Sequence, residues 1–274
     1  MSWIVKLNKT YDSVIGHTGL DESKVPLLPI SHTTVQAQIS VTVDMDGNFV
    51  SASVIPKEAA TTVIPCTEAS GARTSGKAPH PLCDTLEYVA GDITDYYDVE
   101  GDSDPESSGL DDSKKTEDIK ESHQEYVGLL KEWCESQYGN DGLSAVLKYV
   151  EKGSLCSDLI GLGLLRLDDE GRLITDWNKG TMGEKPELYS VIAGSSVKSF
   201  VRWVVSTPSG DEELSEQAIW KSWEKFYESK AEEDGICMIT GEEVLIAENH
   251  PAKIRNSGDK AKLISSNDTS GFTF

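Results

Sequence analysis

The sequence predicts an α+β fold, with a β-rich N-terminal part, a helical middle and a C-terminal strand segment. Residues 35–43 alternate strictly between apolar and polar, which is typical of a strand that turns one face to a core. Beyond residue 122, apolar residues instead recur at helical spacing. The chain has 274 residues, 38% of them hydrophobic, so it is long enough to bury a core.

The first part, residues 1–91, is predicted to be β-rich. After the alternating strand, Asp46 and Gly47 are suited to a tight hairpin turn, and residues 49–55 form the returning strand. Residues 61–64 predict a further strand. Prolines mark the strand edges, where a missing N–H group does least damage: Pro26, Pro29, Pro56 and Pro65.

The second part, residues 92–121, is strongly acidic. It contains twelve Asp or Glu residues and three Lys residues, separated by Ser, Gly and Pro, with almost no apolar side chains to bury. Such a segment cannot offset the entropy that it would lose on ordering. We expect a flexible acidic insert or linker. A nucleic-acid mimic or a regulatory tether is the alternative.

The third part, residues 122–274, combines helices with strands. Two amphipathic helices are predicted by two apolar sets: Tyr126, Leu129, Leu130, Trp133 and Cys134, and Leu143, Val146, Leu147 and Val150. Residues 165–174 predict a small hairpin, and residues 197–206 predict a buried strand. Residues 214–228 predict a helix with an aromatic stripe. We interpret this stripe as core or subunit interface rather than a base-stacking surface, because few cations lie between the aromatic residues.

The net charge of the chain is −22, but its last residues, 250–274, have the opposite balance. Only Asp259 and Asp268 accompany the four cations of this basic C-terminal block: Lys253, Arg255, Lys260 and Lys262. Polar side chains there, including Asn256 and Asn267, can bond phosphate oxygens. Since fields between exposed charges fade over about 8 Å at physiological salt, a local basic patch can act on an acidic body. We therefore expect an anionic partner.

Several classes of protein find no support in the sequence. The longest apolar run near the middle, residues 159–165, has seven residues, far fewer than the roughly 20 that span a bilayer. The N-terminus lacks the basic region and apolar stretch of a signal peptide, so we expect a cytoplasmic protein. The five cysteines form no Cys-x-x-Cys pair, which argues against a disulfide framework and a zinc ribbon. Residues 270–274 alternate like a strand and then stop, so we expect a fragment of a longer protein.

A loop at residues 71–78 nearly matches the phosphate-binding loop of nucleotide hydrolases. Its sequence is Gly-Ala-Arg-Thr-Ser-Gly-Lys-Ala, but Ala78 replaces the Ser or Thr that would bind magnesium. Pro79 and Pro81 follow where a long helix should begin. We therefore expect no nucleotide site and no cofactor. The remaining readings are a plain solvent loop and a loop that enters a DNA groove, where arginine recognises a guanine edge and lysine holds a phosphate.

A catalytic centre finds little support. His32, His80 and Asp84, with Ser31 beside His32, could belong to a Ser-His-Asp hydrolase, but the sequence has no Gly-x-Ser-x-Gly elbow. The five histidines show no i, i+4 pairing, so we expect no metal centre. Cys237 lies beside a predicted turn with no histidine nearby to activate it, which favours a structural role.

Four segments carry a more specific pattern. They are Pro-Leu-Leu-Pro-Ile-Ser-His-Thr-Thr at residues 26–34, Arg-Thr-Ser-Gly at residues 73–76, Cys-x-x-Thr-Gly-Glu at residues 237–242 and Gly-Asp-Lys-Ala-Lys-Leu-Ile-Ser-Ser-Asn-Asp at residues 258–268. Together they resemble the large subunit of type I-C CRISPR surveillance complexes (Cascade). The resemblance runs from the first residue to the last and is to the N-terminal portion of that longer subunit. The acidic segment, residues 92–121, is not a hallmark of the family, and we expect it to be an exposed loop that faces away from nucleic acid.

The resemblance implies a non-enzymatic subunit of an RNA-guided antiviral assembly, near the 5′ handle of the guide RNA. Such a subunit recognises the protospacer-adjacent motif in double-stranded DNA, promotes unwinding and helps to recruit a helicase-nuclease. Transferred to this chain, the nucleic-acid contacts fall into two groups. The loop contributes Arg73, Thr74, Ser75 and Lys77. The basic C-terminal block contributes Lys253, Arg255, Asn256, Lys260, Lys262 and Asn267.

Two alternatives stay open at this point. The chain could be a scaffold subunit whose basic C-terminal block docks guide RNA or another subunit and never touches the target duplex. It could also be a hydrolase that uses His32, His80 and Asp84.

Overall fold

The computed structural model describes residues 3–14, 28–73, 77–97, 112–178, 183–214, 217–230, 234–237 and 240–245. Within these ranges the chain forms helices and a mixed sheet, which confirms the predicted α+β class. The strands are β1 (His32–Asp44), β2 (Phe49–Val54), β3 (Thr61–Pro65), β4 (Phe200–Thr207), β5 (Gly210–Glu213), β6 (Asp234–Ile236) and β7 (Glu243–Leu245). The helices are α1 (Trp3–Val14), α2 (Glu68–Gly71), α3 (Leu86–Val89), α4 (Ile93–Tyr96), α5 (Asp112–Glu135), α6 (Asp141–Val150), α7 (Leu155–Gly161), α9 (Glu187–Val191) and α10 (Gln217–Ser229), with 3-10 turns η2 (Lys57–Ala59) and η4 (Ser196–Lys198).

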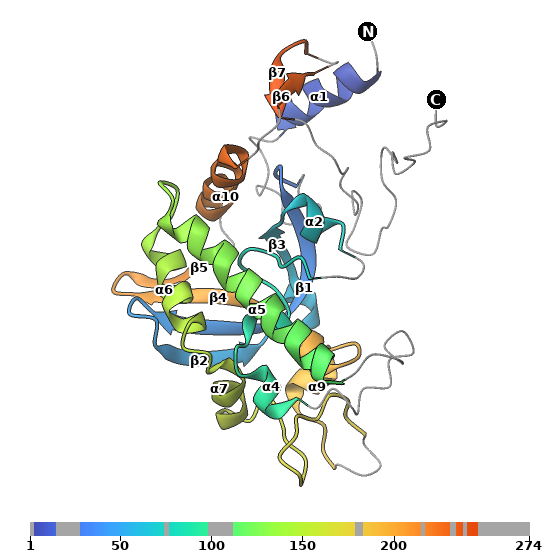
Figure 1. The fold of residues 1–274 in the computed structure, drawn as a ribbon, viewed down its shortest axis with the longest axis vertical. Helices are drawn as coiled ribbons and strands as arrows, with labels where there is room; N and C mark the ends of the chain where they lie inside the picture. Colours follow the sequence, from blue (N-terminus) through green and yellow to red (C-terminus); the bar gives the residue numbers. More distant parts are fainter. Residues whose placement is uncertain are drawn as a thin grey trace.

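Strand β1 is the centre of the fold. It pairs antiparallel with β2 and β3 and parallel with β4, and β5 completes the order β2-β1-β4-β5 (Figure 1). The alternation predicted from the sequence is confirmed, because every second side chain of β1 is buried: Val35, Ala37, Ile39, Val41 and Val43. The sequence parts on either side of the acidic segment therefore share one sheet, since β1 comes from the first and β4 from the third.

The predicted hairpin between β1 and β2 is confirmed. Gly47 has a φ of +74°, the left-handed conformation that favours glycine. The Asp44 carboxylate accepts hydrogen bonds from the backbone N–H groups of Asn48 and Asp46 and from the Asn48 amide, and these bonds lower the pKa of Asp44. The turn lies against α6, and just beyond the end of this helix the Lys152 ammonium donates to the side-chain oxygen of Asn48 at 2.8 Å.

Helices cover one face of the sheet and share a core with it. Helix α6 packs against β1 and β4, α5 packs against α6 and α3, and α3 contacts β4. Figure 1 shows α5 lying across the sheet. The Tyr126 hydroxyl and the Trp203 indole both donate to the carbonyl oxygen of Leu82, at 2.7 and 3.0 Å. The two predicted amphipathic helices are α5 and α6, and their fully buried side chains include Tyr126, Leu130, Trp133, Leu143 and Val146.

The acidic segment differs from its prediction at both ends. Asp92 is buried and accepts hydrogen bonds from the backbone N–H groups of Cys156 and Ser157 in α7, at 2.9 and 2.8 Å. At the other end, α5 begins within the segment, because Ile119 extends the apolar face that packs on the core. The predicted flexible insert, residues 92–121, therefore included residues that belong to α4 and α5. Residues 98–111 lie outside the described residues.

The aromatic stripe of α10 packs into the core, as predicted. Trp223 contacts Trp133 of α5 edge-on, with ring centroids 5.0 Å apart, and Phe226 stacks on Trp133 at 6.4 Å. The Trp223 indole donates to the carbonyl oxygens of Ser31 and Cys66, at 3.1 and 3.3 Å. Helix α10 therefore ties the start of β1 and the end of β3 to α5.

The smaller predicted elements are partly confirmed. The hairpin expected after α7 is a single antiparallel bridge between Leu167 and Leu173. The strand predicted at residues 197–206 is β4, preceded by the turn η4. Strands β6 and β7 form a separate two-stranded sheet, with Cys237 in the turn between them. The strand predicted at residues 270–274 lies outside the described residues.

Replacing Gly47 with alanine should destabilise the protein. An added Cβ would lie 2.5 Å from the Cβ of Lys148 and 2.9 Å from the carbonyl oxygen of Ala145, on a backbone with positive φ. We expect the free energy of unfolding, measured by urea titration, to fall by about 1–3 kcal/mol. In the matched control, Gly128→Ala in α5, the Cβ meets nothing within 4 Å, and the free energy of unfolding should rise by about 0.5–1 kcal/mol. Equal losses in both variants would contradict the close approach of this turn to α6.

Candidate nucleic-acid interface

The candidate loop follows β3 and the short helix α2. The first turn of α2 is capped reciprocally: the Thr67 hydroxyl accepts from the Ser70 N–H group at 3.0 Å, and the Ser70 hydroxyl accepts from the Thr67 N–H group at 2.9 Å. Arg73 comes directly after this turn, and residues 74–76 lie outside the described residues. The described residues 77–85 contain no helix, so the element that a nucleotide-binding loop places after its lysine does not follow here.

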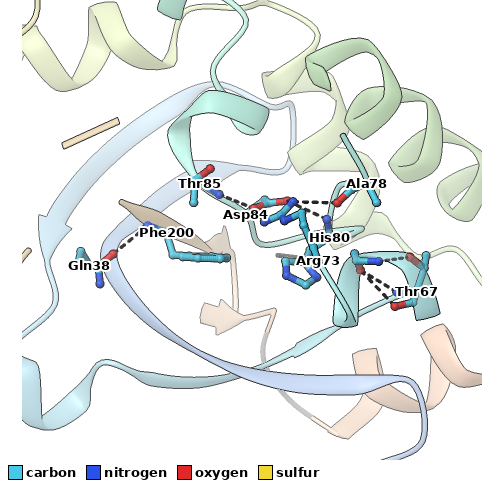
Figure 2. A network of polar contacts seen from close by, with 9 residues as sticks. Gln38, Thr67, Arg73, Ala78, His80, Asp84, Thr85 and Phe200 are labelled. Atoms are coloured by element: carbon cyan, nitrogen blue, oxygen red, sulfur yellow. Dashed lines mark hydrogen bonds and ion pairs between the residues drawn. The ribbon is translucent and has the colours of Figure 1, made fainter. Parts of the chain in front are cut away.

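Arg73 is held by a buried carboxylate. Its Nη2 and Nη1 atoms lie 2.7 and 2.9 Å from Oδ1 and Oδ2 of Asp84, and Nη1 also donates to the carbonyl oxygen of Ala78 at 2.8 Å (Figure 2). The Asp84 side chain has no exposed surface, and only 15% of the Arg73 side chain is exposed. The guanidinium lies 4.4 Å from the centre of the Tyr88 ring. The two described ends of the loop, Arg73 and Ala78, are thereby joined.

Asp84 accepts four hydrogen bonds, two on each oxygen. Besides the bonds from Arg73, Oδ2 accepts from the backbone N–H group of His80 and Oδ1 accepts from that of Thr85, both at 2.8 Å (Figure 2). These bonds fill the acceptor positions of the carboxylate and offset its loss of hydration. The backbone carbonyl of Asp84 also accepts from the N–H group of Val201 in β4, at 2.9 Å. Asp84 therefore connects the loop to the sheet.

Lys77 is paired at the surface. Its ammonium nitrogen lies 2.7 Å from Oδ1 of Asp118 and also contacts the Glu121 carboxylate, both on α5. Hydrogen bonds to Asp118 and then to Glu121 raise the pKa of Lys77 above its ordinary value. All three side chains are partly exposed, with 38% of the Lys77 side chain accessible to solvent. The charge of Lys77 is therefore balanced by α5, but in an open position.

The predicted site residues fall into two groups. Arg73 and Lys77 are described, and each is paired with carboxylates, which counts against direct contact with DNA in this conformation. The others lie outside the described residues: Thr74, Ser75, Lys253, Arg255, Asn256, Lys260, Lys262 and Asn267. The roles of all ten residues stay predictions.

The acids that hold these two cations were not found by sequence reasoning. From the sequence, Asp84 is a candidate only for catalysis, although its place between the apolar residues Leu82 and Leu86 could have indicated a buried acid that needs a cation. Asp118 and Glu121 fall in the predicted flexible insert, although their i, i+3 spacing places both on one side of a helix.

The geometry around Asp84 does not support the hydrolase alternative. A catalytic histidine would need an acceptor position on this carboxylate, but all of them are occupied, and His80 approaches it through its backbone N–H group. His32 lies at the start of β1, where its Nδ1–H group donates to the carbonyl oxygen of Ile30 at 2.8 Å. Its ring packs edge-on against Trp220, with centroids 6.0 Å apart. His32 is thus a buried residue that contributes to packing.

Metal binding and thiol chemistry find no site in the described part of the chain. In that part, no group of three or more His, Cys, Asp or Glu side chains is placed to hold a metal ion. The five cysteines all lie in it and form no disulfide. Burial raises the pKa of the Cys83 and Cys134 thiols to about 12, so both stay protonated at neutral pH. None of the helices in the described ranges is long and apolar enough to cross a membrane.

The stability of the protein should depend on pH through His32. Burial lowers the pKa of His32 from 6.5 to about 4, although the hydrogen bond to Ile30 partly opposes this shift. Between pH 6.5 and pH 4 the unfolded chain therefore binds a proton that the folded protein does not bind, and stability falls as the pH falls. We expect this to remove about 3 kcal/mol from the free energy of unfolding across the window.

The measurement is the free energy of unfolding in urea at several pH values, for the parent and for His32→Gln. The parent should lose stability more steeply than the variant between pH 6.5 and pH 4. A smaller slope remains in both proteins, because burial also lowers the pKa of His123. Identical slopes in the two proteins would show that His32 is not buried in its neutral form.

A comparison with protein families gives a match over almost the whole chain. Residues 7–274 match the family described as CRISPR-associated protein (Cas_Csd1). No curated protein sequence matches the chain. Because the family match covers far more than half of the residues, the chain belongs to the Cas_Csd1 family of CRISPR-associated proteins.

Proposed function

We propose that this chain is the large subunit of a type I-C CRISPR surveillance complex (Cascade) and that it recognises the protospacer-adjacent motif in double-stranded DNA. In this role it acts in the cytoplasm without catalysis or a cofactor, promotes DNA unwinding at the start of the R-loop and supports recruitment of the helicase-nuclease. The observation that carries the proposal is the family match over residues 7–274. In RNA-guided systems base pairing recognises the long target, and the protein recognises only the short flanking motif.

The contacts of Arg73 and Lys77 support this proposal, because recognition of base edges needs well-positioned supporting residues. Arg73 is attached to the sheet through a buried ion pair, and Lys77 is attached to α5 through Asp118 and Glu121. The turn before them is supported by α10, where the Tyr227 hydroxyl accepts from the first N–H group of α2 at 3.0 Å. We assign contacts with base edges to the hydroxyls of Thr74 and Ser75.

Arg73 has a different role in this proposal from the one expected from the sequence. A direct contact with guanine would require the guanidinium to leave Asp84, whose side chain has no exposed surface. Breaking a buried pair costs about 3–5 kcal/mol, whereas a good base contact contributes about 1–3 kcal/mol. The balance favours the buried pair. We therefore assign Arg73 as the anchor of the loop and not as the residue that contacts the base.

The basic C-terminal block supports contact with a polyphosphate. Its four cations stand against two acids in a chain of net charge −22, and cations on a phosphate backbone contribute affinity without sequence preference. We assign Lys253, Arg255, Lys260 and Lys262, with Asn256 and Asn267, to the DNA backbone or to the 5′ handle of the guide RNA.

A scaffold subunit is the second candidate, and one observation favours it. Both cations of the loop are paired with acids of the same chain, so this part presents no unpaired cation to DNA. In the scaffold role, the basic C-terminal block docks guide RNA or another subunit, and the target duplex is recognised elsewhere in the assembly.

Binding of the reconstituted complex to duplexes that differ only in the flanking motif tests the proposal. Thr74→Ala/Ser75→Ala should reduce the preference for the cognate motif by about 1–3 kcal/mol, because base-edge contacts are lost. Lys260→Ala/Lys262→Ala should instead weaken binding to all duplexes alike and lower the slope of log K against log salt by about 2, because two phosphate contacts are lost.

The matched control for the lysines is Lys120→Ala/Lys225→Ala, which removes two exposed cations from α5 and α10. This control should leave both the motif preference and the salt slope unchanged. If the complex binds every duplex equally well, and the loop variant does not differ from the parent, the scaffold function replaces the proposed one.

A further inference from the structure

The two cations of the loop are held by contacts of different strength. The Arg73 pair is buried, with Asp84 fully inaccessible, whereas Lys77 and its partners on α5 are exposed: 38% of Lys77, 37% of Asp118 and 52% of Glu121. Exposed ion pairs contribute little to stability, whereas a buried pair cannot be opened without a large loss. Of these two cations, Lys77 is therefore the one that can exchange its partner.

The contact of Lys77 with α5 is not required to hold that helix. The buried side chains of Tyr126, Leu130 and Trp133 fix α5 on the core. Asp118 and Glu121 lie nearer its N-terminus, on the turn that faces the loop. Their carboxylates provide Lys77 with oxygen acceptors of the kind that a phosphate also offers, and an ammonium group binds either as a point charge.

We propose that Asp118 and Glu121 form an acidic latch that competes with nucleic acid for Lys77. In the free protein the two carboxylates occupy the ammonium group, and a phosphate placed by correct docking of the loop displaces them. This inference rests on the proposed function, because it assigns the regulation of the same loop. The latch lowers affinity for every polyanion, so that weak, nonspecific duplexes are rejected before the motif is recognised.

The matched comparison is between two pairs of neutralised acids on the same helix. Asp118→Asn/Glu121→Gln opens the latch, and Glu117→Gln/Glu125→Gln changes the net charge equally at exposed positions outside the Lys77 contact. The chain, alone and in the reconstituted complex, is titrated against a fluorescent DNA duplex that lacks the cognate motif. The open-latch variant should bind about three- to tenfold more tightly than the control variant.

The same comparison in a Lys77→Ala background isolates the contact. Without the ammonium group the open-latch and control variants should bind alike, since both have lost two negative charges. Equal binding of the two variants with Lys77 present would overturn the latch while leaving the proposed function intact. Absence of duplex binding in every protein, with or without the complex, would instead reject the proposed function.

A second readout does not depend on DNA. Amine acetylation followed by mass spectrometry should label Lys77 more slowly in the parent and in the control variant than in the open-latch variant, because the carboxylates hold the ammonium group in its protonated form. Equal labelling rates of Lys77 in all three proteins would overturn the latch. The rate at Lys57, an exposed lysine of η2, should be the same in each and serves as the internal reference.

Discussion

The ion pair between Asp84 and Arg73 is the constraint on which the candidate interface depends. Asp84 is fully inaccessible to solvent, so its charge needs a cation and a complete set of hydrogen bonds to be tolerated. It obtains them from Arg73 and from the backbone of His80 and Thr85, while its own backbone bonds Val201 in the sheet. Arg73 is thereby fixed to the central sheet by one carboxylate. The position of Arg73 follows from the burial of this acid.

The contrast between the two loop cations links the packing to the proposed function. Arg73 is committed to the interior, because no base contact compensates for an unpaired buried carboxylate. Lys77 lies at the surface between two acids and can exchange a carboxylate for a phosphate at small cost. One loop thus combines a permanent anchor with an exchangeable contact. In the proposed function both contacts have a use, since the anchor holds Arg73 in place and the acids oppose nonspecific binding.

Local periodicity made the main helices and strands predictable, whereas contacts between residues far apart in sequence could not be predicted. The alternation of β1, the Asp46-Gly47 turn, the apolar faces of α5 and α6 and the aromatic stripe of α10 all follow local rules of burial, and the structure confirms them. The N-terminal end of the acidic segment could not be predicted, because Asp92 accepts hydrogen bonds from a helix 64 residues away in sequence. The same holds for Lys77, whose partner Glu121 is 44 residues away. Composition identified the loop, but only the fold shows which acids neutralise it.

The most direct test of this account is a double-mutant cycle on the buried pair, read as the free energy of unfolding in urea. Asp84→Asn and Arg73→Met should each cost about 3–5 kcal/mol, because each leaves an uncompensated partner in the interior. The double variant should lose little more than either single variant, since the charges then disappear together. Additive losses, or an Asp84→Asn variant as stable as the parent, would contradict the central place of this ion pair.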